Sequence, residues 1–119
     1  MGAGAVSALR AGDIVTIDFP GVEGVKRRPA IVVSSSTYHQ YRPDVIVGIV
    51  TSQIQQATAP TDYLVKDWVE TGLHRPSAFR TFLATLPATA ATPIGHCSER
   101  DWEGIVDCFR KVIARSDGA

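Results

Sequence analysis

The sequence has few of the features that mark membrane proteins, metal sites or disulfide frameworks. Its 119 residues include two cysteines, Cys97 and Cys108, and neither stands at the CxxC or Cys/His spacing typical of a zinc site. No apolar run approaches the ~18 residues of a membrane-spanning helix, and the first residues lack the basic and apolar regions of a secretory signal. We therefore expect a cytoplasmic protein with reduced thiols, no membrane contact, and neither a metal nor another cofactor.

Net charge is absent as well, because 12 basic and 12 acidic side chains cancel. Proteins that hold a nucleic acid through its backbone usually carry a basic excess. Any contact with a nucleic acid should therefore depend on a local patch of positive charge. The tightest basic cluster is Lys26-Arg27-Arg28, whose ordinary interpretation is a solvated loop.

The common catalytic patterns are missing too. The sequence has no GxSxG elbow, no Walker loop and no GxGxxG motif. His39, His74 and His96 are isolated from one another, which favours structural or surface roles for all three. Cys97 could act as a nucleophile only beside a base, and a small buried thiol is the favoured interpretation.

The length fits one domain with a core of its own. The first residues are small and rich in alanine and glycine. We expect residues 12–115 to form a single domain, between a flexible arm of residues 1–11 and a flexible tail of residues 116–119.

Apolar and β-branched residues gather in short segments separated by glycine, proline and polar residues, a pattern typical of strands. The predicted strands cover residues 14–19, 29–34, 44–52, 62–65 and 76–82, with a less distinct continuation over 83–87. The intervening residues 20–27, 35–43 and 68–73 are predicted to form a loop and two turns. Gly48, inside the third strand, indicates a sharp bend or a close approach of two backbones.

One segment has a clear helical period. Apolar residues recur every three to four positions from Trp102 to Ile113, and Ser98 stands at the N-cap position before them. Acidic residues at its start and basic residues at its end complement the helix dipole. Several strands followed by one helix predict a mainly β domain of the α+β type, with an antiparallel sheet.

Two strand ends carry side chains suited to a phosphate. Arg28 lies where the predicted loop enters the second strand, and Thr51 and Ser52 end the third. If these strands are neighbours, a planar guanidinium and two hydroxyls converge on one point. The alternative is structural, with the arginine binding carbonyls and the threonine filling a strand end. The spacing alone leaves both open.

The segments GDIVTIDFPG, RPAIVVS and VIVGIVTSQ, at matching distances, resemble the MazF/PemK toxins of bacterial type II toxin–antitoxin modules. The later segments DYLVKDWVETGL, RPSAFRTFLATL and IGHCSERDWEGIVDCFRKVI are similar to the second half of that family, so the resemblance covers roughly residues 12–114. It implies an SH3-like β-barrel of about five to seven strands with a C-terminal α-helix, usually a homodimer. It also implies a cognate antitoxin, a small protein whose disordered tail folds into the RNA groove.

The resemblance further implies metal-independent, sequence-selective cleavage of single-stranded RNA, leaving a 2′,3′-cyclic phosphate and a 5′-hydroxyl. The arginine of the family's RP motif falls on Arg28, and the hydroxyl residue after its third strand falls on Thr51; these are the predicted catalytic residues. A loop from Phe19 to Arg27 is implied to close over RNA or to move when the antitoxin binds. The predicted substrate-binding residues are Phe19, Lys26, Arg27, Ser52 and Gln53. The general base stays open, because an arginine is a poor proton acceptor.

Two other functions remain as alternatives. A CcdB-like toxin of the same fold acts on DNA gyrase by binding alone, and it does not require the pair of Arg28 and Thr51. A metal-dependent hydrolase is disfavoured, since the sequence shows no cluster of carboxylates and histidines.

Overall fold

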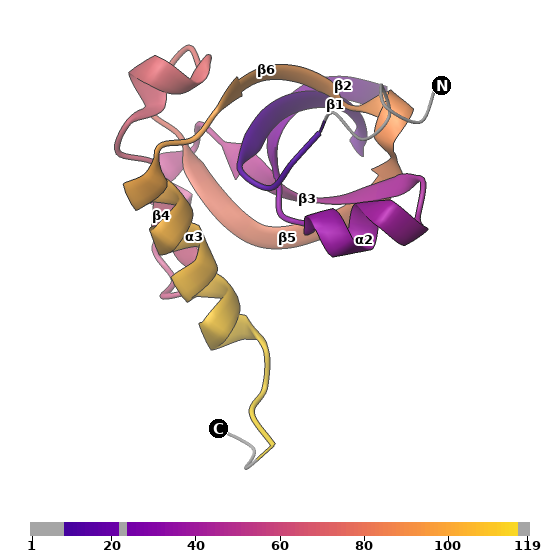
Figure 1. Ribbon diagram of the computed structural model, residues 1–119. Coiled ribbons are helices and arrows are strands. Elements are labelled where there is room, and N and C mark those ends of the chain that lie inside the picture. Colours follow the sequence, from indigo (N-terminus) through magenta and orange to yellow (C-terminus); the bar gives the residue numbers. More distant parts are fainter. Residues whose placement is uncertain (1–8, 22–23, 117–119) are drawn as a thin grey trace.

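Six strands form one antiparallel sheet in the computed structural model, which describes residues 9–21 and 24–116. The strand order is β4-β5-β3-β2-β1-β6, and the sheet curls around itself (Figure 1). The strands are β1 (Asp13–Gly21), β2 (Gly24–Val32), β3 (Asp44–Thr51), β4 (Asp62–Leu64), β5 (Ala78–Pro87) and β6 (Thr92–His96). This confirms the predicted fold class, a mainly β domain of the SH3-like type with a C-terminal helix.

The long helix α3 (Glu99–Val112) packs beside β4 and β5, and the short helix α2 (Ser36–Tyr41) packs against β3 (Figure 1). The Ser98 side chain caps α3 by accepting a hydrogen bond from the Asp101 N–H, which confirms the predicted N-cap. Three short 3₁₀ turns complete the described chain: η1 (Ile54–Gln56), η2 (Trp68–Thr71) and η3 (Ala88–Ala90). No helix in the described residues is long and apolar enough to cross a membrane.

The core has two parts, one on each face of the sheet. Val15 and Ile17 of β1 lie in one part, and Ile14 lies in the other, because successive strand residues point to opposite faces. In β2, Ala30 and Ile31 are both fully buried although they belong to different parts. This burial on both faces explains why the second strand is apolar without alternation.

Gly48 of β3 lies against the buried ring of Phe79 from β5. A Cβ atom built there would be 2.1 Å from Cε1 of Phe79, the largest fully buried side chain of the core. The pairing of β3 with β5 shifts register between Gly48 and Val50. The glycine thus makes room for an aromatic side chain, whereas the sequence predicted a bend or a second backbone.

Three local predictions were wrong. Most of the predicted loop over residues 20–27 belongs to the two arms of the β1–β2 hairpin, in which Phe19 pairs with Lys26. Residues 36–41, predicted as a turn, form α2, whose first turn is capped by the Ser35 hydroxyl. β6 was not predicted, because a proline and a glycine interrupt its sequence and its partner is the distant strand β1.

The last residues of the predicted N-terminal arm, residues 9–11, are ordered against the domain. Leu9 is buried in the core part that contains Val15, and the Arg10 N–H donates to the Asp13 carboxylate at 2.9 Å. Residues 9–11 therefore belong to the folded domain. The rest of the predicted arm, residues 1–8, and most of the predicted tail, residues 117–119, lie outside the described residues.

Candidate active-site cleft

A cleft of about 770 Å³ opens beside the β1–β2 hairpin. Its walls come from β1, β2, the end of β3, the segment of residues 72–77 and β6. The lining residues are Thr16, Lys26, Arg27, Arg28, Pro29, Val50, Ser52, Gln53, Gly72, Leu73, His74, Arg75, Ser77 and Ile94.

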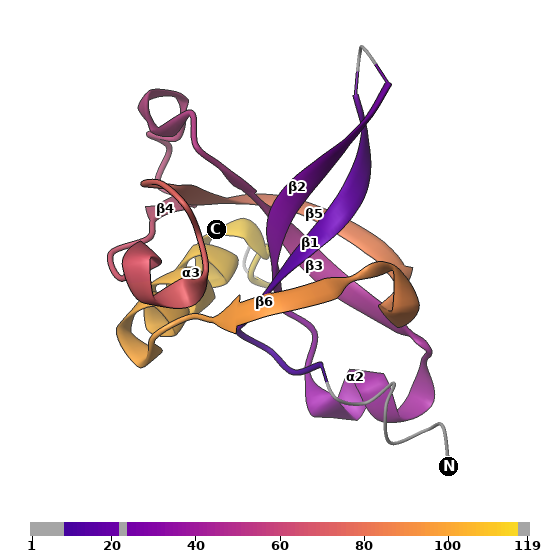
Figure 2. The ribbon, with the colours of Figure 1, turned by 90° about the horizontal axis from the view of Figure 1, so that it is seen from above.

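The cleft opens where β2 is no longer paired with β3. β2 pairs with β3 only from Ala30 to Val32, whereas it pairs with β1 along its whole length. Residues 24–29 therefore have no strand on their second side within the described chain, and the hairpin extends beyond the rest of the sheet (Figure 2). An unpaired strand edge of this kind exposes backbone hydrogen-bonding groups and side chains of both faces to a ligand.

The lining of the cleft is basic although the whole chain is neutral. It contains Lys26, Arg27, Arg28 and Arg75, and no Asp or Glu is among the lining residues. Arg27 has partners: its Nη1 donates to Asp18 Oδ1 and its Nη2 to Thr92 Oγ1, both at 2.9 Å. In the described part of the chain, the other three side chains make no hydrogen bond or ion pair. This local excess of positive charge attracts an anionic ligand.

The second predicted catalytic residue, Thr51, is half-buried and lies between two lining residues, Val50 and Ser52. The pairing of β2 with β3 ends at Ala30 and Ile49, two residues before Arg28 on one strand and two residues before Thr51 on the other. Arg28 lines the cleft and Thr51 does not, so their convergence stays a prediction. The Thr51 hydroxyl accepts a hydrogen bond from the Gln53 N–H at 3.0 Å.

The five predicted substrate-binding residues separate into two groups. Lys26, Arg27, Ser52 and Gln53 line the cleft. Phe19 does not, because it packs edge-to-face on Phe82 of β5 with ring centroids 5.8 Å apart. That contact joins the β1–β2 hairpin to β5.

Sequence reasoning missed the segment of residues 72–77, which supplies His74, Arg75 and Ser77 to the cleft. No local pattern marks these residues as a site, since they form a short connection between η2 and β5. The only signal was their order in the longer family resemblance.

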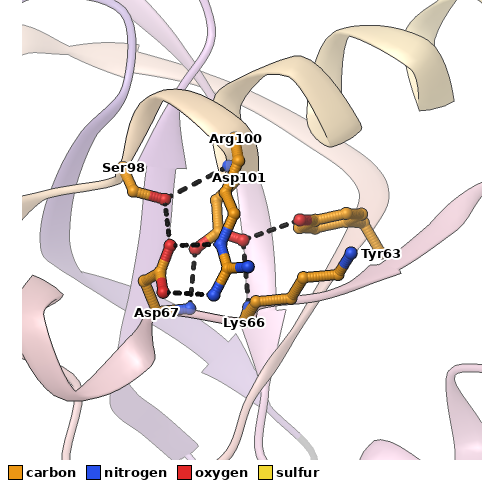
Figure 3. Close-up of polar contacts among 6 residues, drawn as sticks. All are labelled: Tyr63, Lys66, Asp67, Ser98, Arg100 and Asp101. Atoms are coloured by element: carbon orange, nitrogen blue, oxygen red, sulfur yellow. Dashed lines mark hydrogen bonds and ion pairs between the residues drawn. The ribbon is translucent and has the colours of Figure 1, made fainter.

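A buried carboxylate holds the chain between β4 and η2, ahead of this segment in the sequence (Figure 3). Asp101, in the first turn of α3, is fully buried. Its Oδ1 accepts hydrogen bonds from the Tyr63 hydroxyl at 2.6 Å and the Lys66 N–H at 2.9 Å, and its Oδ2 accepts from the Asp67 N–H at 2.9 Å. We call this set of contacts the Asp101 clamp. Burial, followed by the hydrogen bond to Asp101, raises the pKa of Tyr63 above its ordinary value.

A second carboxylate extends the clamp toward the surface. Asp67 accepts hydrogen bonds from Ser98 Oγ at 2.6 Å and from Nε and Nη2 of Arg100 at 2.8 and 2.7 Å (Figure 3). The bidentate arginine contact, and then the hydroxyl, lower the pKa of Asp67 from 3.8 to about 2.

This shift predicts a defined loss of stability in acid. The pKa of Asp67 is lower in the folded state than in the unfolded state. Its contribution to the free energy of unfolding is therefore complete above pH 3.8 and disappears as the pH falls toward about 2. Urea unfolding at a series of pH values should show this loss in the wild type and a flatter profile in Asp67→Asn. Glu99→Gln, at an exposed position of α3, should keep the wild-type profile. An unchanged profile in Asp67→Asn would contradict the prediction.

The cysteines are not nucleophiles at neutral pH. Both are buried and free, and burial raises the pKa of the Cys97 thiol to about 11 and that of Cys108 above its ordinary value. This agrees with the expectation of a buried, unreactive thiol at Cys97. Among the described residues, no three His, Cys, Asp or Glu side chains form a group that could hold a metal ion.

Comparison with known proteins relates most of the chain to a single family. Residues 10–113 match the model of a family described as PemK-like, MazF-like toxin of type II toxin-antitoxin system. No curated protein matches the sequence.

Several solved structures share the fold. An endoribonuclease in complex with its cognate antitoxin, from a mycobacterial species, has a TM-score of 0.72 and 17% identity over 87% of this chain and 93% of that chain. A second mycobacterial endoribonuclease has a TM-score of 0.69 and 16% identity over 87% and 89% of the two chains. A MazE–MazF structure from Deinococcus radiodurans has a TM-score of 0.69 and 17% identity over 87% and 94%.

Proposed function

Because this chain belongs to the family of PemK-like, MazF-like toxins of type II toxin–antitoxin systems, we propose that it is an endoribonuclease. In this proposal it cleaves single-stranded messenger RNA at selected sequences in the cytoplasm, without a metal ion. The observation that carries the proposal is the basic cleft, where Arg28 has no ionic partner in the described residues. The endoribonuclease activity of the structural neighbours supports the same reaction class.

The proposed reaction needs little beyond positioning and charge stabilisation. The ribose 2′-hydroxyl attacks the adjacent phosphorus, its proton leaves, and the bond from phosphorus to the 5′-oxygen breaks. The products are a 2′,3′-cyclic phosphate and a 5′-hydroxyl, which takes up a proton. Because the nucleophile belongs to the substrate, its proximity is already provided. The Arg28 guanidinium is suited to bind two phosphate oxygens and to stabilise the charge that builds up on them.

The hydroxyl residues next to Arg28 provide further donors. We assign Thr51 to the catalytic pair with Arg28, because Thr51 ends β3 between two residues that line the cleft, Val50 and Ser52. Ser52 and Gln53 are exposed in the cleft and are suited to hydrogen-bond a nearby phosphate or base. Lys26 and Arg27 extend the positive charge along the hairpin, where they would follow the RNA backbone.

Two protein partners belong to the proposal. A cognate antitoxin would cover the cleft, because an acidic flexible segment complements its charge. A second copy of the chain would cover exposed apolar residues on the neighbouring strands β4 and β5. These are Leu64, Phe82 and Leu83, and exposed apolar groups of this kind are typical of interaction surfaces.

The direct test is cleavage of a mixed-sequence RNA by the purified protein in EDTA. We expect discrete fragments whose 5′ ends accept phosphate from a kinase without prior phosphatase treatment, because they carry hydroxyls. An oligonucleotide with 2′-deoxyribose at the mapped cleavage sites should stay intact. Intact RNA under all conditions, together with inhibition of DNA gyrase, would support the CcdB-like alternative. Cleavage that EDTA abolishes would contradict metal independence.

A further inference from the structure

The cleft is rich in proton donors and poor in proton acceptors. The four basic side chains present only charged N–H groups, which donate to phosphate oxygens and offer no acceptor; these are Lys26, Arg27, Arg28 and Arg75. Ser52, Thr16 and Ser77 are hydroxyls, which are weak bases, and Gln53 is a neutral amide. Attack of the 2′-hydroxyl oxygen on phosphorus requires a group that accepts the proton of this hydroxyl.

Among the lining residues, His74 alone meets that requirement. An imidazole is the side chain that both accepts and releases a proton near neutral pH. His74 is exposed within the cleft, and in the described part of the chain its ring makes no hydrogen bond or ion pair. The charged groups that share the cleft with it are Lys26, Arg27 and Arg28 from β2 and Arg75 from its own segment. Its ring nitrogens are therefore available to a substrate.

The backbone that carries His74 is held on both sides. Before it, Gly72 adopts a left-handed conformation with φ 88° and passes so close to β6 that a Cβ atom would lie 2.5 Å from the Ile94 carbonyl oxygen. Leu73 is buried in the core, and after it Ser77 is buried, with its hydroxyl donating to the Arg75 carbonyl at 2.9 Å. An exposed side chain on a fixed backbone is well placed to meet a substrate in a constant position.

We propose that His74 is the general base of the cleavage reaction, an assignment that rests on the proposed ribonuclease function. Its neutral imidazole takes the proton of the attacking 2′-hydroxyl while the bond from that oxygen to phosphorus forms. The bond to the 5′-oxygen breaks with its electron pair, and the 5′-oxygen receives a proton from the imidazolium or from water. Arg28 stabilises the phosphate oxygens throughout this step, so the two residues have separate roles.

The test compares His74→Ala with the wild type on RNA that contains a mapped cleavage site. We expect kcat to fall by about 10²–10⁴-fold, the usual contribution of a general base. The wild-type rate should decline on the acid side of its pH profile, and this acid limb should be missing in His74→Ala. Added imidazole should restore part of the activity of His74→Ala and none of that of Arg28→Ala. Affinity for RNA with 2′-O-methyl groups at the cleavage site should not change.

His39→Gln is the matched control, because His39 lies in α2, outside the cleft lining, and glutamine preserves a contact with Ser34. It should keep both the rate and the acid limb. If the wild type cleaves RNA and His74→Ala keeps its rate, or loses activity without losing the acid limb or responding to imidazole, the base assignment is wrong and the ribonuclease proposal stands. If the wild type cleaves no RNA, the proposed function itself fails.

Discussion

Replacing Arg28 by alanine is expected to abolish RNA cleavage, with a loss of at least about 10²–10³-fold in kcat, the usual effect of removing one donor to a developing oxyanion. The fold should survive, because the Arg28 side chain is half-buried and makes no hydrogen bond or ion pair in the described residues. Cleavage rates at saturating RNA, together with urea unfolding of the same samples, measure the two effects separately.

Arg28→Lys sharpens this test, because it keeps the charge and removes the planar fork. We expect it to bind RNA but to recover little of the lost rate, since a single ammonium cannot contact two phosphate oxygens as a guanidinium does. Thr51→Ala should also abolish cleavage with the fold intact, whereas Thr51→Ser keeps the hydroxyl that the Gln53 N–H contacts. Arg42→Ala, at an exposed arginine beyond α2, is the matched control and should cleave normally. Full activity of Arg28→Ala would exclude the proposed mechanism.

Among the substitutions that we propose, removal of the Asp101 carboxylate should cause the largest decrease in the free energy of unfolding. Asp101→Ala leaves the Tyr63 hydroxyl and the N–H groups of Lys66 and Asp67 without their acceptor in a buried site. An unsatisfied buried donor costs about 1–3 kcal/mol, so we expect a total of about 3–5 kcal/mol after partial relaxation. Urea unfolding gives this difference directly, provided that the slope m is unchanged.

Two measurements distinguish the loss of the Asp101 clamp from a general destabilisation of α3. Glu103→Ala, at an exposed position of α3, should change the free energy of unfolding by less than about 0.5 kcal/mol. In Asp101→Ala the pKa of Tyr63 should fall toward its ordinary value, because one of the contacts that raise it is gone; ultraviolet titration of the phenol measures this shift. A loss of stability in Asp101→Ala no greater than that in Glu103→Ala would mean that the clamp is not a stabilising contact.

The parts of the fold that could be predicted are those with a local pattern. The period of the apolar residues and the Ser98 cap identified α3, and the β-branched runs identified the strands around Ile14, Ile31 and Val47. β6 could not be found in this way, because it is a strand only through its pairing with β1. The same holds for the outer hairpin arms, where β1 and β2 stabilise each other.

The residues of the candidate site also divide into those with a local sequence pattern and those placed by distant contacts. The sequence allowed us to predict that Arg28 and Ser52 belong to one site, because each stands at the end of a recognisable strand. His74 could not, since its place in the cleft depends on the path of the chain after β4, and that path is fixed by the distant Asp101. Contacts between residues so far apart are set by the tertiary structure and leave no trace in a local pattern.

The Asp101 clamp also bears on when the protein becomes functional during its synthesis. α3 is the last helix of the described chain to leave the ribosome, and the clamp joins it to residues that emerged much earlier. A nascent chain that ends before Ser98 lacks the carboxylate that orders the path toward His74. Translation must therefore proceed past Asp101 before the cleft is whole. For a protein whose proposed target is messenger RNA, this delay keeps an unfinished copy from attacking the transcript that encodes it.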